Sequence, residues 1–396
     1  MADLSALRES MVAQVRERRI SDATAHALLT VPRHLFLPEV PPETAYRNEA
    51  IVTRRDAGGL PTSSSSQPTI MAMMLDQLDV RPGQRVLEVG AGTGYNAALL
   101  AHLVGPRGEV VSVDIDPEVA RQAGDHLKAA GFPEVTVACA DGFEGFAERA
   151  PYDRVIATVG VWDLAPAWLD QMAPGGRLVV PLDLRGVQRS VAMEREGERW
   201  TSRSVVACGF MRMRGPSAGP ELVRILDRDS ELMIFLPEAR DVGDVLAVLD
   251  GPSMEISTGT SAEEAQLLDG LVLWLAVREP RCCSLAEARS GRLPCLSEIP
   301  GFAITFGVVD RDGLCVLGTS GTDGRLTVHA YGPGGGRLTA DLLVHLREWD
   351  AAGRPGSDGL RIDARRGPLP ADGRPVVPAG AQVIGKRHTH LVLSWT

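Results

Sequence analysis

The chain has 396 residues, of which 44% are hydrophobic and 23% are charged, a composition typical of a folded protein with more than one domain. Its 41 basic and 51 acidic residues give a formal charge of −10, which disfavours general binding to nucleic-acid backbones. No run reaches the roughly 20 apolar residues of a membrane helix, and the polar N-terminus is unlike a signal peptide. We expect a cytoplasmic monomer with neither a nucleic-acid nor a membrane partner.

The N-terminal part is predicted to be helical. Apolar residues at spacings of three and four predict a helix over residues 4–15, and a second helix over 23–30 ends before a proline. Residues 36–66 are rich in Pro, Gly and Ser and are expected to form a long ordered loop. A loop of that length inside a compact domain is usually functional.

The next segment alternates between strand and helix patterns, which predicts a parallel sheet covered on both faces. The predicted strands are 85–89, 110–113, 135–137, 155–157 and 177–180, and the predicted helices are 68–78, 90–104 and 117–130.

A Gly-Pro stretch at 215–220 is predicted to be a linker, and a mixed region follows it. We therefore divide the chain into a catalytic domain at 1–215 and an α+β accessory domain at 221–396. The predicted elements of the second domain are strands at 231–236, 302–309, 315–318, 326–331 and 390–395, and helices at 262–277 and 339–349.

Glycines at every second position follow the first predicted strand: Gly90, Gly92 and Gly94. Glycine is needed where the backbone turns sharply and a ligand approaches it closely. Dinucleotide enzymes also have such a loop, but their third glycine comes at the position that Tyr95 occupies here. An acidic Glu88 inside the motif would repel a pyrophosphate and suits a cationic sulfonium ligand with an amino group.

Two further acids follow the next predicted strands. Asp114 ends the second strand and can accept hydrogen bonds from ribose hydroxyls, and Asp141 follows the third strand and can reach an adenine edge. Each acid alone is better explained as a solvated loop carboxylate. In order at successive strand ends, Glu88, Asp114 and Asp141 favour a nucleoside ligand.

These motifs resemble the protein-L-isoaspartate O-methyltransferases over about residues 7–215. The resemblance implies an α/β, Rossmann-like fold that uses S-adenosyl-L-methionine and releases S-adenosyl-L-homocysteine. The matching segments are Val31-Pro32-Arg33-His34-Leu35-Phe36-Leu37-Pro38, Ser66-Gln67-Pro68, Gly94-Tyr95, Asp141-Gly142, residues 151–156 and residues 175–181.

The resemblance also implies roles for individual residues. Ser66 would lie beside the methyl acceptor and orient its carboxylate, and Ser64, Ser65, Gln67, Arg54 and Arg55 are expected to bind substrate. No general base is needed, because a carboxylate with a pKa of about 3.9 is already ionised at neutral pH. The expected cofactor-binding residues are Glu88, Gly90, Ala91, Gly92, Thr93, Gly94, Tyr95, Asp114, Ile115, Asp141 and Gly142.

The chain departs from the family in residues 51–66 and in its C-terminal extension. The segment has two adjacent arginines and replaces a Thr-Ile pair with Ser64-Ser65. This combination resembles the branch associated with ribosomally made, modified peptides of lanthipeptide and graspetide pathways. It implies an aspartate of a macrocyclic precursor peptide as the acceptor, leading to a succinimide and then isoaspartate. Loop drift without functional change is the alternative explanation.

The remaining alternatives concern the accessory domain and the activity. The extension is expected either to recognise peptide or to brace the first domain. His388 and His390 share a strand face, but no metal site is expected, and the six scattered cysteines form no CxxC pair. The main competing function is repair of isoaspartyl residues in damaged proteins. A non-catalytic scaffold and a nucleic-acid methyltransferase are disfavoured by the intact motifs and by the acidity.

Overall fold

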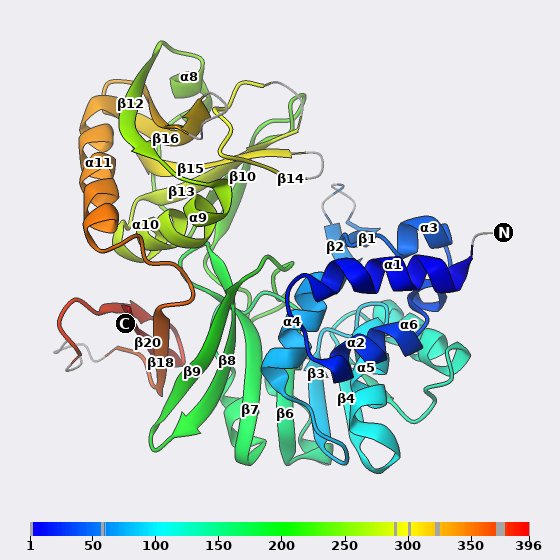
Figure 1. Cartoon of the computed structure of the whole chain (residues 1–396). Helices are drawn as coiled ribbons and strands as arrows, with labels where there is room; N and C mark the ends of the chain where they lie inside the picture. The colour runs from blue at the N-terminus through cyan, green and yellow to red at the C-terminus, as the bar shows by residue number, and fades with distance from the viewer. Residues whose placement is uncertain are drawn as a thin grey trace.

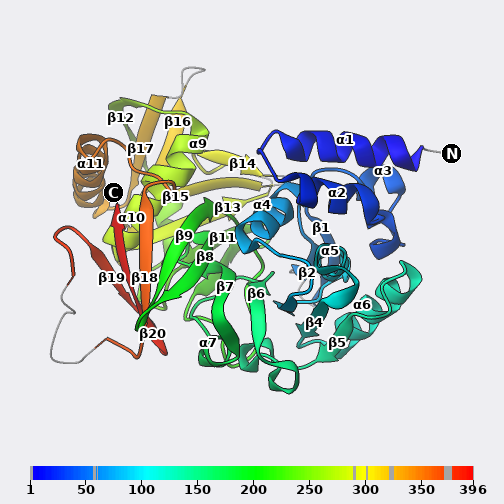
Figure 2. The ribbon, with the colours of Figure 1, turned by 60° about the horizontal axis from the view of Figure 1, so that its bottom comes forward.

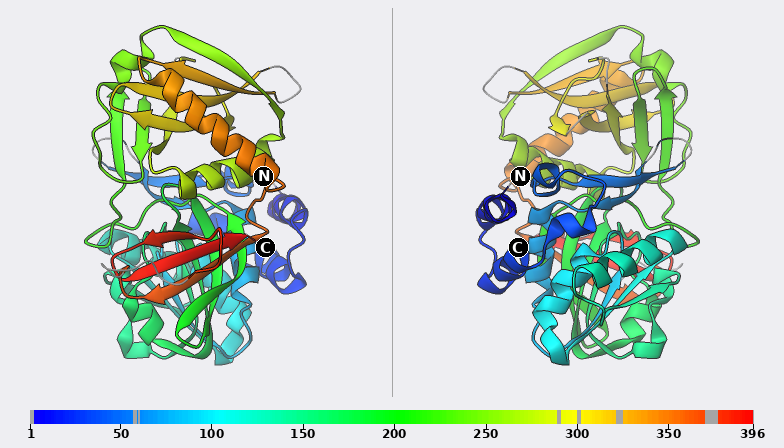
Figure 3. Two further views of the ribbon diagram at one scale, coloured as in Figure 1. Left: turned by 90° about the vertical axis from the view of Figure 1, so that its left-hand side faces the viewer. Right: turned by 90° about the vertical axis from the view of Figure 1, so that its right-hand side faces the viewer.

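The computed structural model describes residues 3–56, 59, 61–288, 291–299, 302–320, 325–369 and 377–395. Two large sheets organise this part of the chain, one above the other (Figures 1 and 3). Among the described residues, no helix has the length and apolarity needed to cross a membrane.

The first sheet has ten strands in the order β19-β20-β18-β9-β8-β7-β6-β3-β4-β5. Neighbours from β5 to β7 run parallel, and neighbours from β7 to β19 run antiparallel. Its strands are β3 (Arg85–Val89), β4 (Glu109–Asp114), β5 (Thr136–Cys139), β6 (Tyr152–Ala157), β7 (Met172–Asp183), β8 (Gln188–Glu196), β9 (Arg199–Ala207), β18 (Leu360–Arg366), β19 (Gln382–Gly385) and β20 (Thr389–Trp395).

Helices cover the parallel half of this sheet, as its apolar strands require. One face packs on the N-terminal helices through a core that includes Met11, Leu28 and Met74. The other face packs around Trp168. The helices of this part are α1 (Leu4–Arg16), α2 (Asp22–Thr30), α3 (Pro42–Ala45), α4 (Pro68–Leu78), α5 (Tyr95–Val104), α6 (Pro117–Ala129) and α7 (Pro166–Asp170).

The second sheet has eight strands with the main order β10-β11-β13-β15-β16-β17-β12, and β14 pairs with β15. Its strands are β10 (Leu222–Asp227), β11 (Leu232–Leu236), β12 (Ser253–Ser261), β13 (Cys282–Glu287), β14 (Ser297–Ile299), β15 (Phe302–Asp310), β16 (Gly313–Ser320) and β17 (Arg325–Tyr331). Its helices are α8 (Val245–Leu249), α9 (Glu264–Gln266), α10 (Val272–Arg278) and α11 (Gly335–Ala351).

The C-terminal strands do not belong to this second sheet. β18 pairs with β9 of the first sheet, with Asp363 opposite Thr201, and β20 and β19 continue the same sheet (Figure 2). Ile362 and Leu391 are buried in the core beneath it. The predicted division at 215–221 therefore differs from the sheet arrangement, since the segment between β9 and β18 is an insertion between two neighbouring strands. Local sequence patterns do not reveal such distant pairing.

Two predicted loops also differ from the structure. Residues 36–66 contain α3 and a hairpin of β1 (Ile51–Arg55) and β2 (Pro61–Ser65), so the expectation of a plain loop was wrong. A serine-rich strand lacks the alternation of apolar residues by which strands are recognised. The predicted linker at 215–220 packs on the protein, because an added Cβ at Gly219 would lie 2.6 Å from the Trp162 ring.

Candidate active site

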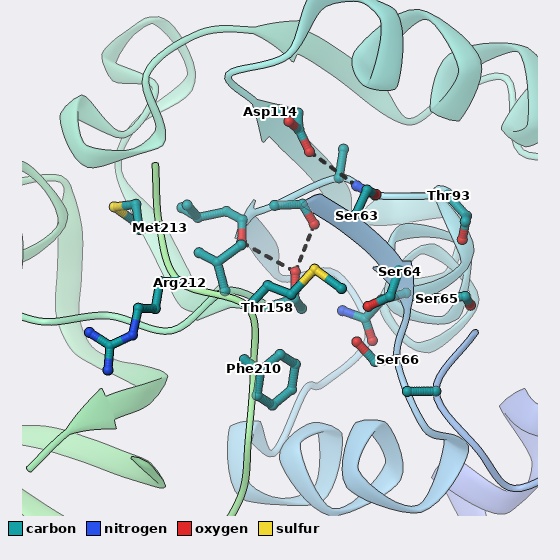
Figure 4. Close-up of a pocket in the computed structure, with 18 of the residues that line it drawn as sticks. Ser63, Ser64, Ser65, Ser66, Thr93, Asp114, Thr158, Phe210, Arg212 and Met213 are labelled. Carbon is teal, nitrogen blue, oxygen red and sulfur yellow. Dashed lines mark hydrogen bonds between the residues drawn. The ribbon is translucent and has the colours of Figure 1, made fainter. Parts of the chain in front are cut away.

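A cavity of about 620 Å³ opens where β3, β4 and β6 end (Figure 4). Its walls include Val89 and Asp114 from the first two strands and Thr158 just after the third. The carboxyl ends of parallel strands are where open α/β sheets bind their ligands. The β1–β2 hairpin and the segment after β9 complete the enclosure.

The glycine loop forms the floor of the cavity. Gly90 has a φ of +102°, and an added Cβ would lie 2.8 Å from the Thr158 hydroxyl and 2.9 Å from a Val159 methyl. Thr158 Oγ1 donates a 2.7 Å hydrogen bond to the Gly90 carbonyl, and the Gly90 amide donates to Val113 at 2.8 Å. The loop backbone is therefore fixed from below and bare above, as close approach of a ligand requires.

The two predicted acids at strand ends both line this cavity. Asp114 accepts hydrogen bonds from the amides of Gly92, at 3.2 Å, and Asp116, at 3.1 Å. Asp141 accepts from the amide of Phe143 at 3.0 Å and caps a short 3-10 helix. Both carboxylates are held by backbone donors, so their orientations are set before any ligand arrives. Ile115 and Gly142 also lie on the wall, as predicted from the motif.

Glu88 borders the cavity, as predicted from the motif, but its side chain lies in the protein interior. Its side chain is 0% exposed, and its carboxylate accepts hydrogen bonds from Asn96, at 2.8 Å, and Ser112, at 2.6 Å. Burial raises the pKa of this carboxyl to about 7, although the two hydrogen bonds oppose the shift. Glu88 thus ties β4 to α5 at the border of the cavity, and its contact with a cationic ligand stays a prediction.

The rest of the motif divides between the wall and the core. Ala91, Gly92 and Thr93 line the cavity, whereas Gly94 is the N-cap of α5 and packs on α6. Tyr95 borders the cavity, but its ring is buried below the Arg33 guanidinium, whose central carbon lies 5.0 Å from the ring centre.

Ser66 lines the same cavity as the glycine loop and lies just after β2 (Figure 4). Arg33, fully buried in the N-terminal signature segment, donates to the Ser66 carbonyl at 3.0 Å and to the Ala45 carbonyl at 2.8 Å. Burial lowers the pKa of this guanidinium, and the ring of Tyr95 packs against it. Arg33 therefore holds the predicted catalytic serine in place through the backbone, a link that the sequence did not reveal.

The other residues predicted to bind substrate are placed unevenly. Ser64, Ser65 and Gln67 line the cavity, and the buried Ser65 hydroxyl has no hydrogen-bond partner in the described part of the chain. Arg54 and Arg55 lie elsewhere. Arg54 pairs with Asp116 at 3.1 Å, and Arg55 donates to the Gly59 carbonyl across the hairpin. Binding of substrate by these two arginines stays a prediction.

Sequence reasoning missed one whole wall of the cavity. Residues 207–214 follow β9 and carry Phe210, Arg212 and Met213 into the site. Arg212 is not free for a ligand, since it forms ion pairs with Asp183 and Glu221. The segment is held by backbone hydrogen bonds to Gly160, and no local motif marks it. Phe302, at the start of β15 in the second sheet, also reaches the cavity.

The fold and the site together define an S-adenosylmethionine-dependent methyltransferase. A glycine loop after the first strand, an acid at the end of the second and a cavity above both fit this cofactor. The particular family follows from residues 6–216, which match the family model described as protein-L-isoaspartate(D-aspartate) O-methyltransferase. The chain belongs to this family.

Relatives agree with this assignment. The chain is 39% identical over 197 residues to a protein-L-isoaspartate O-methyltransferase of Methanopyrus kandleri, covering 49% of this chain and 84% of that protein. It is 34% identical over 238 residues to a protein of the same name from Thermotoga maritima, covering 60% of this chain and 73% of that protein. A solved structure titled protein-L-isoaspartate O-methyltransferase has a TM-score of 0.52 at 24% identity, covering 90% of this chain and 96% of that one.

These findings bear on the predicted acceptor. The likeness to the solved structure covers 90% of this chain, so it extends beyond the family-matched residues. The C-terminal extension therefore belongs to the part of the chain whose fold is similar to that structure. The relatives compared support the isoaspartate alternative better than the precursor peptide.

Proposed function

We propose that this protein methylates the free carboxylate of isoaspartyl residues in damaged proteins. The observation that carries the proposal is the meeting of two separate segments at one cavity. The glycine loop and Ser66 of the family's Ser-Gln-Pro motif both line it. A relative of Methanopyrus kandleri with the isoaspartate name shares 39% identity over this region.

The chain's own residues position and enclose the reactants. Bound S-adenosylmethionine supplies an electrophilic methyl group. Gly90, Gly92 and Asp114 would hold it, and the Ser66 hydroxyl would donate a hydrogen bond to one acceptor oxygen, leaving the other to be methylated. No proton has to be removed, because the carboxylate is already ionised. Alignment of the two reactants is worth several kcal/mol in such a reaction (roughly 7–11 at best).

The product explains why methylation would serve repair. A methyl ester is attacked by the amide nitrogen of the following residue, which releases methanol and closes a succinimide ring. Hydrolysis of the ring returns part of the material to aspartate. These later steps are solution chemistry and ask nothing further of the protein.

A second candidate is esterification of an aspartate in a ribosomally made, macrocyclic precursor peptide. It is supported by the departure at Ser64-Ser65, since both residues line the cavity beside Ser66. A changed wall at that position would change the acceptor that fits.

One experiment separates the two candidates. The purified protein is incubated with S-adenosylmethionine and either an isoaspartyl peptide or an aspartate-containing macrocyclic peptide, and masses are followed. We expect methylation of the isoaspartyl peptide, lost in Ser66→Ala and kept in Ser257→Ala, a control at an exposed strand position. Methylation of the macrocycle alone would refute repair and establish the second candidate.

A further inference from the structure

The second sheet presents an apolar face that its helices cover only in part. On the far half of this face, α10 and α11 bury Val308, Leu317 and Val328. On the near half, strands β10, β11 and the start of β15 carry apolar side chains that no helix of the described chain buries. The opposite face of the same strands is the buried core around Ile234 and Leu285.

Strand register places these near-half side chains on one face. Val223 lies opposite Phe235, and Ile225 lies opposite Met233. The register across β13 places Ile304 in line with Met233 on the same face. Residues opposite one another in antiparallel strands share a face, and so do alternate residues in one strand, which adds Phe302. We call this set the apolar strip: Val223, Ile225, Met233, Phe235, Phe302 and Ile304.

The strip is exposed at its β10 end, where Val223 is 40% exposed and Ile225 45% exposed, and the other four side chains are half-buried. On β13, between Met233 and Ile304, the same face carries the buried Ala286. A group of apolar side chains at a surface often marks a binding site. β10 is also the last strand of its sheet, so the strip ends at an edge.

The strip begins inside the candidate active site. Phe302 lines the cavity together with Phe210 and with Val52 of the β1–β2 hairpin. In Figure 1, the end of β14 and the start of β15 lie on the side of the second sheet that faces that hairpin. One aromatic side chain therefore belongs both to the cavity where the acceptor would sit and to the strip that leads away from it.

We propose that the apolar strip binds apolar side chains that flank the modified residue in the acceptor polypeptide. This inference rests on the proposed function, because it takes the cavity to be the acceptor site. The path from β15 to β10 crosses three strand spacings, about 14 Å, which an extended segment of about four residues spans. The preferred acceptor is thus an unfolded segment with apolar residues within about four positions of the isoaspartate.

The continuity at Phe302 favours a substrate over other occupants. A second copy of the chain on the strip would close the cavity mouth that Phe302 borders. Damaged proteins that have lost their fold expose apolar segments, and these are the segments that a strip of this chemistry recognises.

The test compares two isoaspartyl peptides of one length, one flanked by Val, Leu and Phe and the other by Ser, Thr and Gln. The full-length wild type, a double variant (Val223→Thr and Ile225→Thr) and a control (Met254→Thr) are measured. Threonine is β-branched and favours strands, as valine and isoleucine do, but it adds a hydroxyl group to the surface. Met254 is 53% exposed on β12, away from the strip.

We expect the wild type to show a KM about 5-fold to 10-fold lower for the apolar-flanked peptide. The double variant should lose most of this difference at unchanged kcat, and the control should keep it. Equal KM values in the wild type, or an equal rise for both peptides in the double variant, would overturn the proposal. So would a wild-type dimer that the double variant dissociates in light scattering.

A measurement of peptide binding distinguishes failure of the proposal about the strip from failure of the proposed function. Fluorescence anisotropy of the labelled apolar-flanked peptide, with S-adenosylhomocysteine present, needs no turnover. Binding that weakens about 5-fold in the double variant, without methylation of either peptide, would support the strip and reject the proposed function. Methylation of both peptides, with no difference in peptide binding between the wild type and the double variant, would support the proposed function and reject the strip.

Discussion

Replacement of Gly90 by alanine should damage cofactor binding far more than it damages the fold. A φ of +102° is unfavourable for any residue with a Cβ, at a cost of roughly 1–2 kcal/mol. The new Cβ would also lie 2.8 Å from Thr158 and 2.9 Å from Val159, and overpacking of this kind costs roughly 1–3 kcal/mol. The loop has to move by a few tenths of an ångström, and it moves into the space above it, where the ligand would lie.

Gly131→Ala provides the matched control. Gly131 has a φ of +89°, but no atom lies within 4 Å of its added Cβ, so this variant carries the backbone strain without the collision. We expect Gly90→Ala to bind S-adenosylhomocysteine at least about 10-fold more weakly by isothermal titration calorimetry, since 1.4 kcal/mol is a factor of ten. Gly131→Ala should lower the melting temperature and keep wild-type affinity. Equal affinities in the two variants would refute this account of the loop.

Three further outcomes are expected. In thermal denaturation, the stability of Glu88→Gln relative to the wild type should increase as the pH rises from 5 to 8. The pKa of Glu88 in the folded state, about 7, exceeds its value in the unfolded state, so the wild type loses stability over this pH range. A stability difference that does not change with pH would contradict this reasoning. Arg33→Lys should lower kcat at least about 10-fold while circular dichroism stays native, because the Ser66 carbonyl loses its donor; an unchanged kcat would show that Ser66 needs no such support. A chain ending at residue 359 should fail to yield soluble protein, since Ile362 and Leu391 help to close the first core; a monodisperse, cofactor-binding fragment in gel filtration would disprove this.

The local part of the site was predictable from the sequence, and the long-range part was not. Gly90, Asp114 and Asp141 follow strands whose apolar runs are plain, and parallel strands bring their carboxyl ends together. The two partners that satisfy the Glu88 carboxylate, Asn96 and Ser112, were not predictable, because they lie on other elements of the fold. The ion pair of Arg54 was not predictable, because its partner Asp116 is 62 residues away along the chain.

The walls contributed by distant segments left no local signal. Residues 207–214 are irregular, and their position depends on the pairing of β8 with β9 and on contacts with Gly160. The hairpin of β1 and β2 is serine-rich and lacks apolar alternation. The C-terminal strands have clear strand patterns, but which sheet they join depends on the pairing of Asp363 with Thr201, which a sequence pattern does not encode.

The insertion between β9 and β18 has a consequence for how a substrate would be held. Because these two strands are antiparallel neighbours, both connections to the inserted sheet start from the same region of the first sheet. The apolar strip is thus covalently tethered twice beside the cavity and cannot diffuse away from it. A polypeptide that docks on the strip presents its reactive residue to the cavity at a high effective concentration, and two weak contacts then combine into one selective encounter.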